Sequence, residues 1–249
     1  MSWSVDLNAD LGEGAGHDDE LLALVTSANI ACGLHAGSAV MMRTSLLAAQ
    51  ARGVAVGAHP GFNDRENFGR REMKLDADEV FALVVYQLGA FAALAHSLGM
   101  QPRHIKPHGA LYNRATRDEA VADAIVRAVR AVDSKLILFA PAASALSRAA
   151  EGDEIAVACE VFADRNYLPD GSLVPRDHPE ALLHDPVVAA NRVFGMLRDN
   201  KVQAIDGSEV AVEADTICVH GDTPHAVEFA RELRVALHQM GVVVGAIGS

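Results

Sequence analysis

Short apolar runs typical of β-strands alternate with helical segments along the whole chain. The predicted strands are residues 5–10, 27–32, 54–59, 104–108, 135–139, 155–162, 216–220 and 242–247. Helix ends lie between them: Asp185 precedes Pro186, a favourable pair for a helix start, and Gly53 follows a helical stretch that it can close. Alternation of this kind predicts an α/β protein whose parallel strands are joined by crossover helices.

Polar residues gather where the predicted strands end, and this favours a closed barrel over an open sheet. The residues concerned are Asp10, His35, His59, His108, Asp164 and Asp222. In a barrel all strand C-termini surround one mouth, whereas an open sheet concentrates its site at one switch point. We therefore expect a modified (β/α) TIM-like barrel of seven or eight mostly parallel strands. The long connection at residues 162–183 is expected over its mouth.

Composition limits the domain organisation and the partners. The 249 residues are 50% hydrophobic and contain no Pro/Gly-rich linker, so we expect a single domain covering residues 1–249. A net charge of −12 disfavours binding to nucleic acid. The first residues do not resemble a secretory signal, and the apolar segment 80–98 is interrupted by Gln87 and His96. We therefore expect a cytoplasmic protein that does not enter the membrane, with this segment as a buried helix.

Alternation also places candidate functional side chains on common strand faces. Asp6, Asn8 and Asp10 share one face of the first strand, with Glu13 on the turn that follows. This predicts a polar site inside the barrel; the alternative is an edge strand with its polar side in solvent. Lys106 and His108 likewise share a face. The lysine either meets carboxylates and can neutralise an anion, or covers apolar surface with its head in solvent.

A second group of candidates lies nearer the C-terminus. Glu160 and Asp164 alternate along a strand with Arg165 beside them, and His220 and Asp222 precede a predicted helix start. A helix N-terminus and an arginine both suit a phosphate or carboxylate. The alternative for Glu160 and Arg165 is a structural ion pair.

Nucleotide and metal motifs are incomplete. The run GEGAG at residues 12–16 lacks the third glycine of a dinucleotide fingerprint, and no Walker A sequence occurs. Histidines at four strand ends, together with Asp10, suit a divalent metal, although H-x-H and H-E-x-x-H spacings are missing. Their alternative role is that of satisfied buried polar groups. The other histidines, His104 among them, have no predicted partner.

Seven blocks in this sequence resemble those of the LamB/YcsF family, the A subunits of 5-oxoprolinase. They are DLNADLGE (6–13), SANIACG with HAG (27–37), GAHPG (57–61), FGRR (68–71), KPHGALYN (106–113), EVFADR (160–165) and VHGD (219–222). The chain departs from the family pattern at Ser38, where an acid is usual, and at Leu34, where phenylalanine is usual.

The resemblance implies a barrel similar to those of glycoside hydrolases and polysaccharide deacetylases, acting with two other 5-oxoprolinase subunits (B and C). It also implies cleavage of 5-oxo-L-proline to L-glutamate, coupled to hydrolysis of ATP to ADP and phosphate, with Mg²⁺ accompanying the nucleotide. Alternatives are a metal-dependent amidohydrolase or deacetylase, and a non-catalytic component that binds 5-oxoproline.

The reaction requires cations for phosphate, a base for water and an anchor for the substrate carboxylate. We expect catalytic roles for Asp10, His59, Lys106, His108, Glu160 and His220. Substrate or phosphate binding is expected of Asn8, Asn29, His35, Arg165 and Asp222. Asp6 and Glu13 are the candidate Mg²⁺ ligands. Replacement of Lys106 by methionine is expected to abolish activity without affecting folding.

Overall fold

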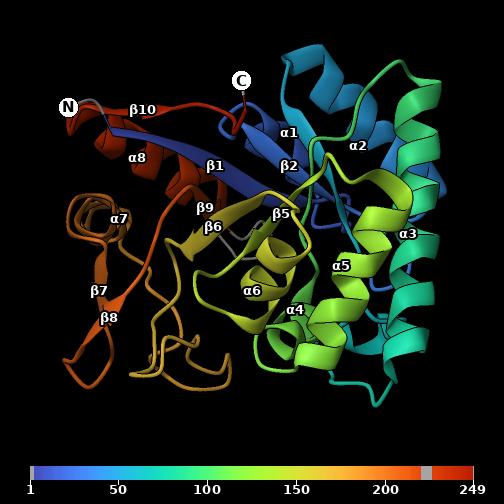
Figure 1. Ribbon diagram of the computed structural model, residues 1–249. Helices are drawn as coiled ribbons and strands as arrows, with labels where there is room; N and C mark the ends of the chain where they lie inside the picture. The colour runs from blue at the N-terminus through green and yellow to red at the C-terminus, as the bar shows by residue number, and fades with distance from the viewer. Residues whose placement is uncertain (1–2, 220–225, 249) are drawn as a thin grey trace.

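Seven parallel strands close into a barrel in the structure, a computed structural model that describes residues 3–219 and 226–248 (Figure 1). Each strand pairs with the next around the barrel, and the last pairs back with the first. In order they are β1 (Trp3–Leu11), β2 (Ser27–Ala31), β3 (Ala55–His59), β4 (His104–Ile105), β5 (Ile137–Ala140), β6 (Val157–Phe162) and β9 (Thr216–Val219). The predicted closed barrel of parallel strands is confirmed.

The long first strand explains how an eighth strand joins the sheet. The inner part of β1 pairs with β9, from Asp6 opposite Thr216 onward, whereas its first residues pair with β10 (Val242–Val244), with Trp3 opposite Val242. β10 thus extends the sheet beside the closed ring. A separate antiparallel hairpin of β7 (Lys201–Gln203) and β8 (Glu209–Ala211) was not predicted.

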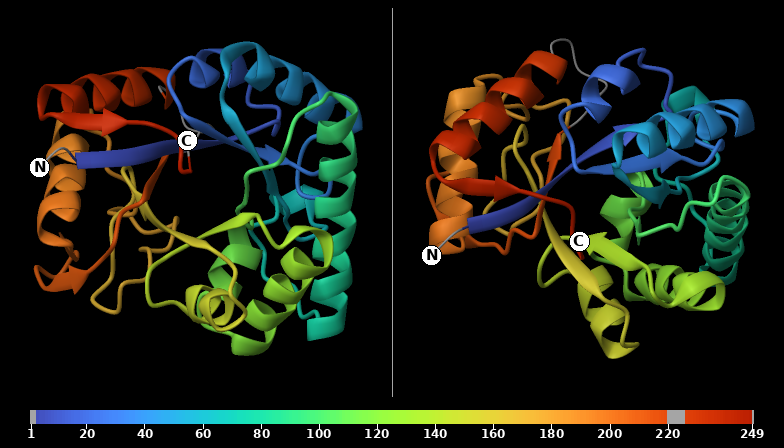
Figure 2. Two further views of the ribbon diagram at one scale, coloured as in Figure 1. Left: turned by 45° about the horizontal axis from the view of Figure 1, so that its top comes forward. Right: turned by 90° about the horizontal axis from the view of Figure 1, so that it is seen from above.

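Helices surround the barrel, and the views of Figures 1 and 2 place α3 and α5 on the side opposite α7 and α8. The helices are α1 (Asp18–Leu22), α2 (Ala39–Arg52), α3 (Ala77–Ser97), α4 (Gly109–Ala115), α5 (Glu119–Asp133), α6 (Ala145–Gly152), α7 (Pro186–Asp199) and α8 (Ala226–Gln239), with a 3₁₀ turn, η1 (Arg65–Asn67). The predicted start of α7 is confirmed, because Asp185 accepts hydrogen bonds from the first turn and Pro186 opens the helix.

Strand alternation separates an apolar outer face of the barrel from a polar interior. Leu7 and Ala9 of β1 are fully buried in the hydrophobic core between barrel and helices. Asp6 and Asn8, on the other face, are 1% and 0% exposed and bond to side chains from other strands. The alternative of a solvated edge strand is therefore wrong, and the interior is where these polar groups meet.

The long apolar helix α3 is buried on one face only. It packs against α5, with Val84 and Phe91 fully buried, while Tyr86 is 65% exposed. By length and composition it is the one helix in the described residues that could cross a membrane, which is weak grounds for a membrane span. Its apolar character serves packing on the outside of the barrel, so the predicted buried helix is confirmed for this face alone.

The long connection between β6 and α7 leaves the barrel at the mouth, because it follows the C-terminal end of β6. Two isolated bridges, Arg165 with Leu182 and Tyr167 with Leu173, fold this connection back on itself. The hydroxyl of Tyr167 also accepts a hydrogen bond from the backbone N–H of Phe162. The Tyr167 side chain therefore fastens the connection to the C-terminal end of β6.

The one-sided burial of α3 predicts unequal effects of two aromatic truncations. Phe91→Ala removes a fully buried ring and should lower the free energy of unfolding by about 3–5 kcal/mol. Tyr86→Ala, on the exposed face of the same helix, should change it by less than about 0.5 kcal/mol. Urea denaturation followed by circular dichroism measures both, and similar losses in the two variants would contradict this orientation of α3.

Candidate active site at the barrel mouth

Asp6 lies at the end of the barrel interior where the strands begin, opposite the mouth. Its carboxylate accepts hydrogen bonds from the hydroxyls of Thr26 at 2.6 Å, Ser27 at 2.7 Å and Thr216 at 2.5 Å. Burial raises the pKa of Asp6, and these hydroxyls partly oppose that effect. Four strand residues, at about 3.3 Å each, put Asp6 about 13 Å below Asp10. The structure therefore does not bring Asp6 together with Glu13, the other predicted Mg²⁺ ligand.

In the next layer toward the mouth, every hydrogen-bonding position of the Asn8 side chain has a partner. Its amide nitrogen donates to Glu160 and Thr216, and its oxygen accepts from Asn29 and from Lys106. An asparagine side chain has two donors and two acceptor lone pairs, so all are used. Asn8 and Asn29, predicted to bind substrate, thus lie below the mouth as supports for other side chains.

His104 belongs to this layer, although no role was predicted for it. Its Nε2 atom donates to Asn29 Oδ1 at 2.8 Å, and its ring stacks on Phe139 at 4.3 Å. Burial lowers the pKa of His104 to about 3, which keeps the ring neutral. Gly57 leaves room for the ring, because a Cβ atom there would lie 2.2 Å from it. The alternation that selected Lys106 and His108 also includes His104 and could have revealed it.

Lys106 is the centre of the polar interior. Its ammonium lies 2.8 Å from Glu160 Oε1, 2.9 Å from Cys218 Sγ and 3.1 Å from Asp10 Oδ1, with Asn8 at 3.3 Å. Burial opposes the charge, but the carboxylates of Asp10 and Glu160 outweigh it and raise the pKa of Lys106 well above its ordinary value. The residue is only 3% exposed, so the alternative with its head in solvent is wrong.

Two further residues around Lys106 were missed by the sequence analysis. The hydroxyl of Tyr112, in the first turns of α4, donates to Glu160 Oε2 at 2.7 Å, and Cys218 lies against the ammonium. Arg165, by contrast, donates to the carbonyl oxygens of Val174 and Ala181 in the long connection. Glu160 therefore pairs with Lys106, and the guanidinium of Arg165 holds the connection in place.

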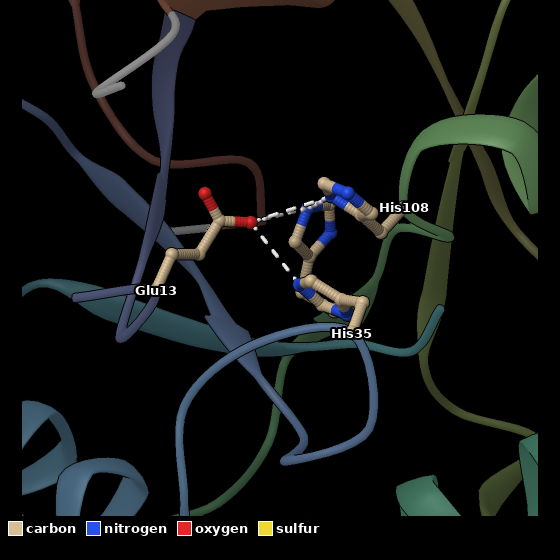
Figure 3. A group of neighbouring side chains, drawn as sticks. Glu13, His35 and His108 are labelled. Atoms are coloured by element: carbon tan, nitrogen blue, oxygen red, sulfur yellow. Dashed lines mark hydrogen bonds and ion pairs between the residues drawn. The ribbon is translucent and has the colours of Figure 1, made fainter. Parts of the chain in front are cut away.

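Nearer the mouth, Glu13 faces His35 and His108 (Figure 3), and His59 is the third histidine beside it. Its Oε1 atom lies 3.1 Å from His35 Nε2, 3.3 Å from His108 Nδ1 and 3.7 Å from His59 Nε2. His59 Nε2 is also 3.4 Å from Asp10 Oδ2. We call Glu13, His35, His59 and His108 the histidine cluster. All four ligand atoms lie within 4.8 Å of one another.

The surroundings shift the pKa values of the three histidines in different directions. Burial lowers the pKa of His35 to about 2 and that of His108 well below its ordinary value. Burial would also lower the pKa of His59, but the Asp10 and Glu13 carboxylates raise it overall. His35 and His108 are therefore neutral rings, and His59 is where positive charge is most stable.

Of the predicted site residues, the structure brings together Asp10, Glu13, His35, His59, Lys106, His108 and Glu160. His220 and Asp222 lie outside the described residues. Ser38, where the family usually has an acid, is the N-cap of α2 and accepts from the backbone N–H of Met41. Aspartate and serine are both good N-caps, so this departure does not alter the site.

The comparisons with known proteins agree with the motif blocks. Residues 5–249 match the sequence profile of the LamB/YcsF family. This chain belongs to that family. A 5-oxoprolinase A subunit from Neisseria meningitidis serogroup A is 51% identical over 97% of this chain and 99% of its own length. The crystal structure of a lactam utilization protein from Thermus thermophilus is 48% identical, with a TM-score of 0.91, covering 98% of this chain and all of the other.

A more distant neighbour shows the fold alone. The family 4 carbohydrate esterase from Streptomyces lividans, in complex with acetate, has 11% identity and a TM-score of 0.52 over 99% of this chain and 93% of its own. This confirms that the LamB/YcsF barrel is similar to the carbohydrate esterase and deacetylase barrels. It carries no information about the reaction.

The surroundings of Lys106 change the expectation for its replacement. Lys106→Met leaves Asp10 and Glu160 buried without a counter-charge, and we now expect it to lower the free energy of unfolding by about 3–5 kcal/mol. Adding Glu160→Gln should recover part of the loss, because one of the two charges is then removed. Chemical denaturation of both variants tests this.

Lys74→Met, at an exposed position, is the matched control and should change stability by less than about 0.5 kcal/mol. A Lys106→Met variant as stable as this control would show that the buried carboxylates do not depend on the ammonium.

Proposed function

We propose that this chain is the A subunit of an ATP-dependent 5-oxoprolinase and acts with two further subunits (B and C). The observation that carries the proposal is the 51% identity, over 97% of the chain, to a relative named as the A subunit of 5-oxoprolinase. The complex opens the lactam ring of 5-oxo-L-proline to give L-glutamate and hydrolyses ATP to ADP and phosphate, with Mg²⁺ accompanying the nucleotide. The name of the Thermus relative, a lactam utilization protein, supports the same substrate class.

The chemistry explains why ATP is needed. An unactivated lactam carbonyl is a poor electrophile, and phosphorylation of its oxygen makes the ring carbon electrophilic. Water then attacks this carbon, the ring C–N bond breaks as the nitrogen takes up a proton, and hydrolysis of the resulting acyl phosphate releases phosphate and glutamate. The attack of water needs a base and a group that stabilises negative charge on oxygen. The mouth offers both kinds of group in Asp10 and Lys106, which lie 3.1 Å apart.

Asp10 is the best candidate for the base. Its side chain is 9% exposed, more than that of Glu13, Lys106 or Glu160, and His59 lies 3.4 Å from its second oxygen. His59 can therefore take up a proton that Asp10 receives from water. Lys106 supplies a fixed positive charge beside the same carboxylate.

The charge around the mouth favours the lactam over the nucleotide. Three carboxylates, Asp10, Glu13 and Glu160, lie close to a single lysine. Such a group repels the several charges of a nucleotide's phosphates more strongly than the single carboxylate of 5-oxoproline. We therefore place the lactam and the attacking water, and not the nucleotide, beside Asp10. The nucleotide phosphates then require cationic groups elsewhere in the three-component complex.

One specific observation favours a second candidate function. The histidine cluster combines imidazole and carboxylate ligand atoms within 4.8 Å of one another, as in metal-dependent amide hydrolases. A metallohydrolase would cleave an amide without ATP and without partner proteins, so the two candidates differ in both requirements.

The proposed function is tested by measuring whether glutamate release requires ATP and each of the three subunits. We expect the co-expressed complex of this chain with its B and C partners to release glutamate from 5-oxo-L-proline only when ATP is present. Omission of this chain should abolish release. Release by this chain alone, without ATP, would support the metallohydrolase instead.

The proposed base gives a sharper prediction. Asp10→Asn in the complete complex should lower kcat for glutamate release at least ~100-fold, because the amide cannot accept a proton from water. Asp78→Asn, which removes a 92%-exposed carboxylate on α3, is the control and should retain full activity. If Asp10→Asn binds 5-oxoproline and leaves the activity of the complex unchanged, this chain is a binding component and its mouth is not the reaction site.

A further inference from the structure

Two histidines of the cluster have one ring nitrogen fixed as a donor. His59 Nδ1 lies 2.7 Å from the carbonyl oxygen of Lys106, and His108 Nε2 lies 2.8 Å from that of Phe68. A carbonyl oxygen can only accept, so each of these nitrogens carries the hydrogen. In a neutral ring the other nitrogen then presents a lone pair. Those lone pairs are on His59 Nε2 and His108 Nδ1.

The two lone pairs face each other. His59 Nε2 and His108 Nδ1 are 2.9 Å apart, and Glu13 Oε1 lies 3.7 Å and 3.3 Å from them. Asp10 Oδ2 is 3.4 Å from His59 Nε2. These four atoms are acceptors that converge on one small space. A cation among them would relieve their mutual repulsion.

The spacing of three of these atoms is close to that of the ligand atoms around a metal ion. Bonds of about 2.1 Å at angles of about 90–109° place neighbouring ligand atoms about 3.0–3.4 Å apart. The separations among Glu13 Oε1, His59 Nε2 and His108 Nδ1 are 2.9, 3.3 and 3.7 Å, so side-chain shifts of about 0.1–0.3 Å bring all three into this range. A single proton would bridge only one pair of these atoms, whereas a metal ion bonds to all three.

The supporting contacts are those that metal-binding histidines require. Each ligating imidazole normally donates its other N–H to a carbonyl or carboxylate, which orients the ring. His59 and His108 do so through Lys106 and Phe68. His35 differs, because its Nδ1 atom is buried and has no hydrogen-bond partner in the described chain. Its Nε2–H donates to Glu13 Oε1 at 3.1 Å, so His35 orients the carboxylate.

Packing holds the rings in this arrangement. His35 and His108 stack with centroids 3.9 Å apart and an interplanar angle of 4°. Gly69 lies against both residues, and a Cβ atom there would be 2.7 Å from the Cβ atom of His35 and 2.9 Å from the ring of His108. Its φ of +64° also favours glycine. Ring stacking and the backbone at Gly69 therefore fix the positions of His35 and His108.

We propose that Glu13, His59 and His108 bind one divalent transition-metal ion of the zinc class, with His35 as a positioning residue for Glu13. Two imidazoles and one carboxylate form a ligand set that leaves further coordination positions open, and Asp10 lies beside them. An ion there would polarise an amide carbonyl as a Lewis acid. The proposal goes beyond the ATP-dependent reaction, which requires no ion held by this chain.

The test measures binding and not activity. The full chain is stripped with a chelator, and Co²⁺ or Zn²⁺ is then titrated by calorimetry, with metal content measured after gel filtration. We expect one ion per chain and, with Co²⁺, visible absorption bands that report nitrogen and oxygen ligands. A folded wild-type chain that binds no stoichiometric ion would overturn the proposal and leave a protonated His59 as the cation.

Metal binding by substituted chains shows which residues hold the ion. Glu13→Gln and His108→Gln should each weaken Co²⁺ binding at least ~100-fold, and His35→Gln about 10–100-fold, as expected for a positioning residue. His96→Gln, an exposed histidine on α3, is the control and should bind as the wild type does. Circular dichroism checks folding. Should His108→Gln not fold, Glu13→Gln, which preserves side-chain shape, decides: unchanged affinity in this variant would place the ion elsewhere and contradict the proposal.

Discussion

The buried ammonium of Lys106 is the interaction on which the rest of the barrel interior depends. A lysine without water is unstable unless carboxylates lie against it, and Glu160 and Asp10 lie 2.8 Å and 3.1 Å away. Those carboxylates in turn need donors, which Tyr112 and Asn29 provide. The interior of this barrel is therefore a connected polar network, where many barrels have layers of aliphatic side chains.

The balance of hydrogen-bond donors and acceptors differs between the end of the barrel where the strands begin and the mouth. Around Asp6 and Asn8 hydrogen-bond donors are matched by acceptors, and such layers hold strands in register. In the histidine cluster acceptors face one another, and positive charge among them is stabilising. We therefore expect the lower layers to contribute mainly to stability and the mouth to bind ligands.

The relatives indicate the class of substrate, while the geometry of the mouth indicates which reactant this chain binds. A relative of 51% identity is named as a 5-oxoprolinase subunit, and this name supports the proposed lactam substrate. The barrel is shared with a carbohydrate esterase at 11% identity and cannot select a reaction by itself. We propose that the acidic mouth binds the lactam and water and that the nucleotide binds elsewhere in the complex. An ion held by Glu13, His59 and His108 would occupy His59 Nε2, so His59 can accept a proton from Asp10 only when no ion is bound.

Local periodicity in the sequence was enough to predict the barrel and many inward-facing residues. Alternation placed Asn8 and Asp10 on one face of their strand, and Lys106 and His108 on one face of theirs, because successive side chains of a strand point to opposite sides. The start of α7 at Pro186 followed from cap and proline chemistry of equally short range. The hairpin of β7 and β8 escaped prediction, since its strands have only three residues each.

Only the tertiary structure decided which of these side chains meet. Pairing between strands distant in the sequence sets Lys106 against Glu160 and turns Arg165 toward the long connection. It also separates Asp6 from the mouth and brings Glu13 to the histidines. The sequence by itself determined the face on which each residue lies, because that depends on neighbours along the strand. Partners and heights in the barrel depend on closure and register, which no local pattern encodes.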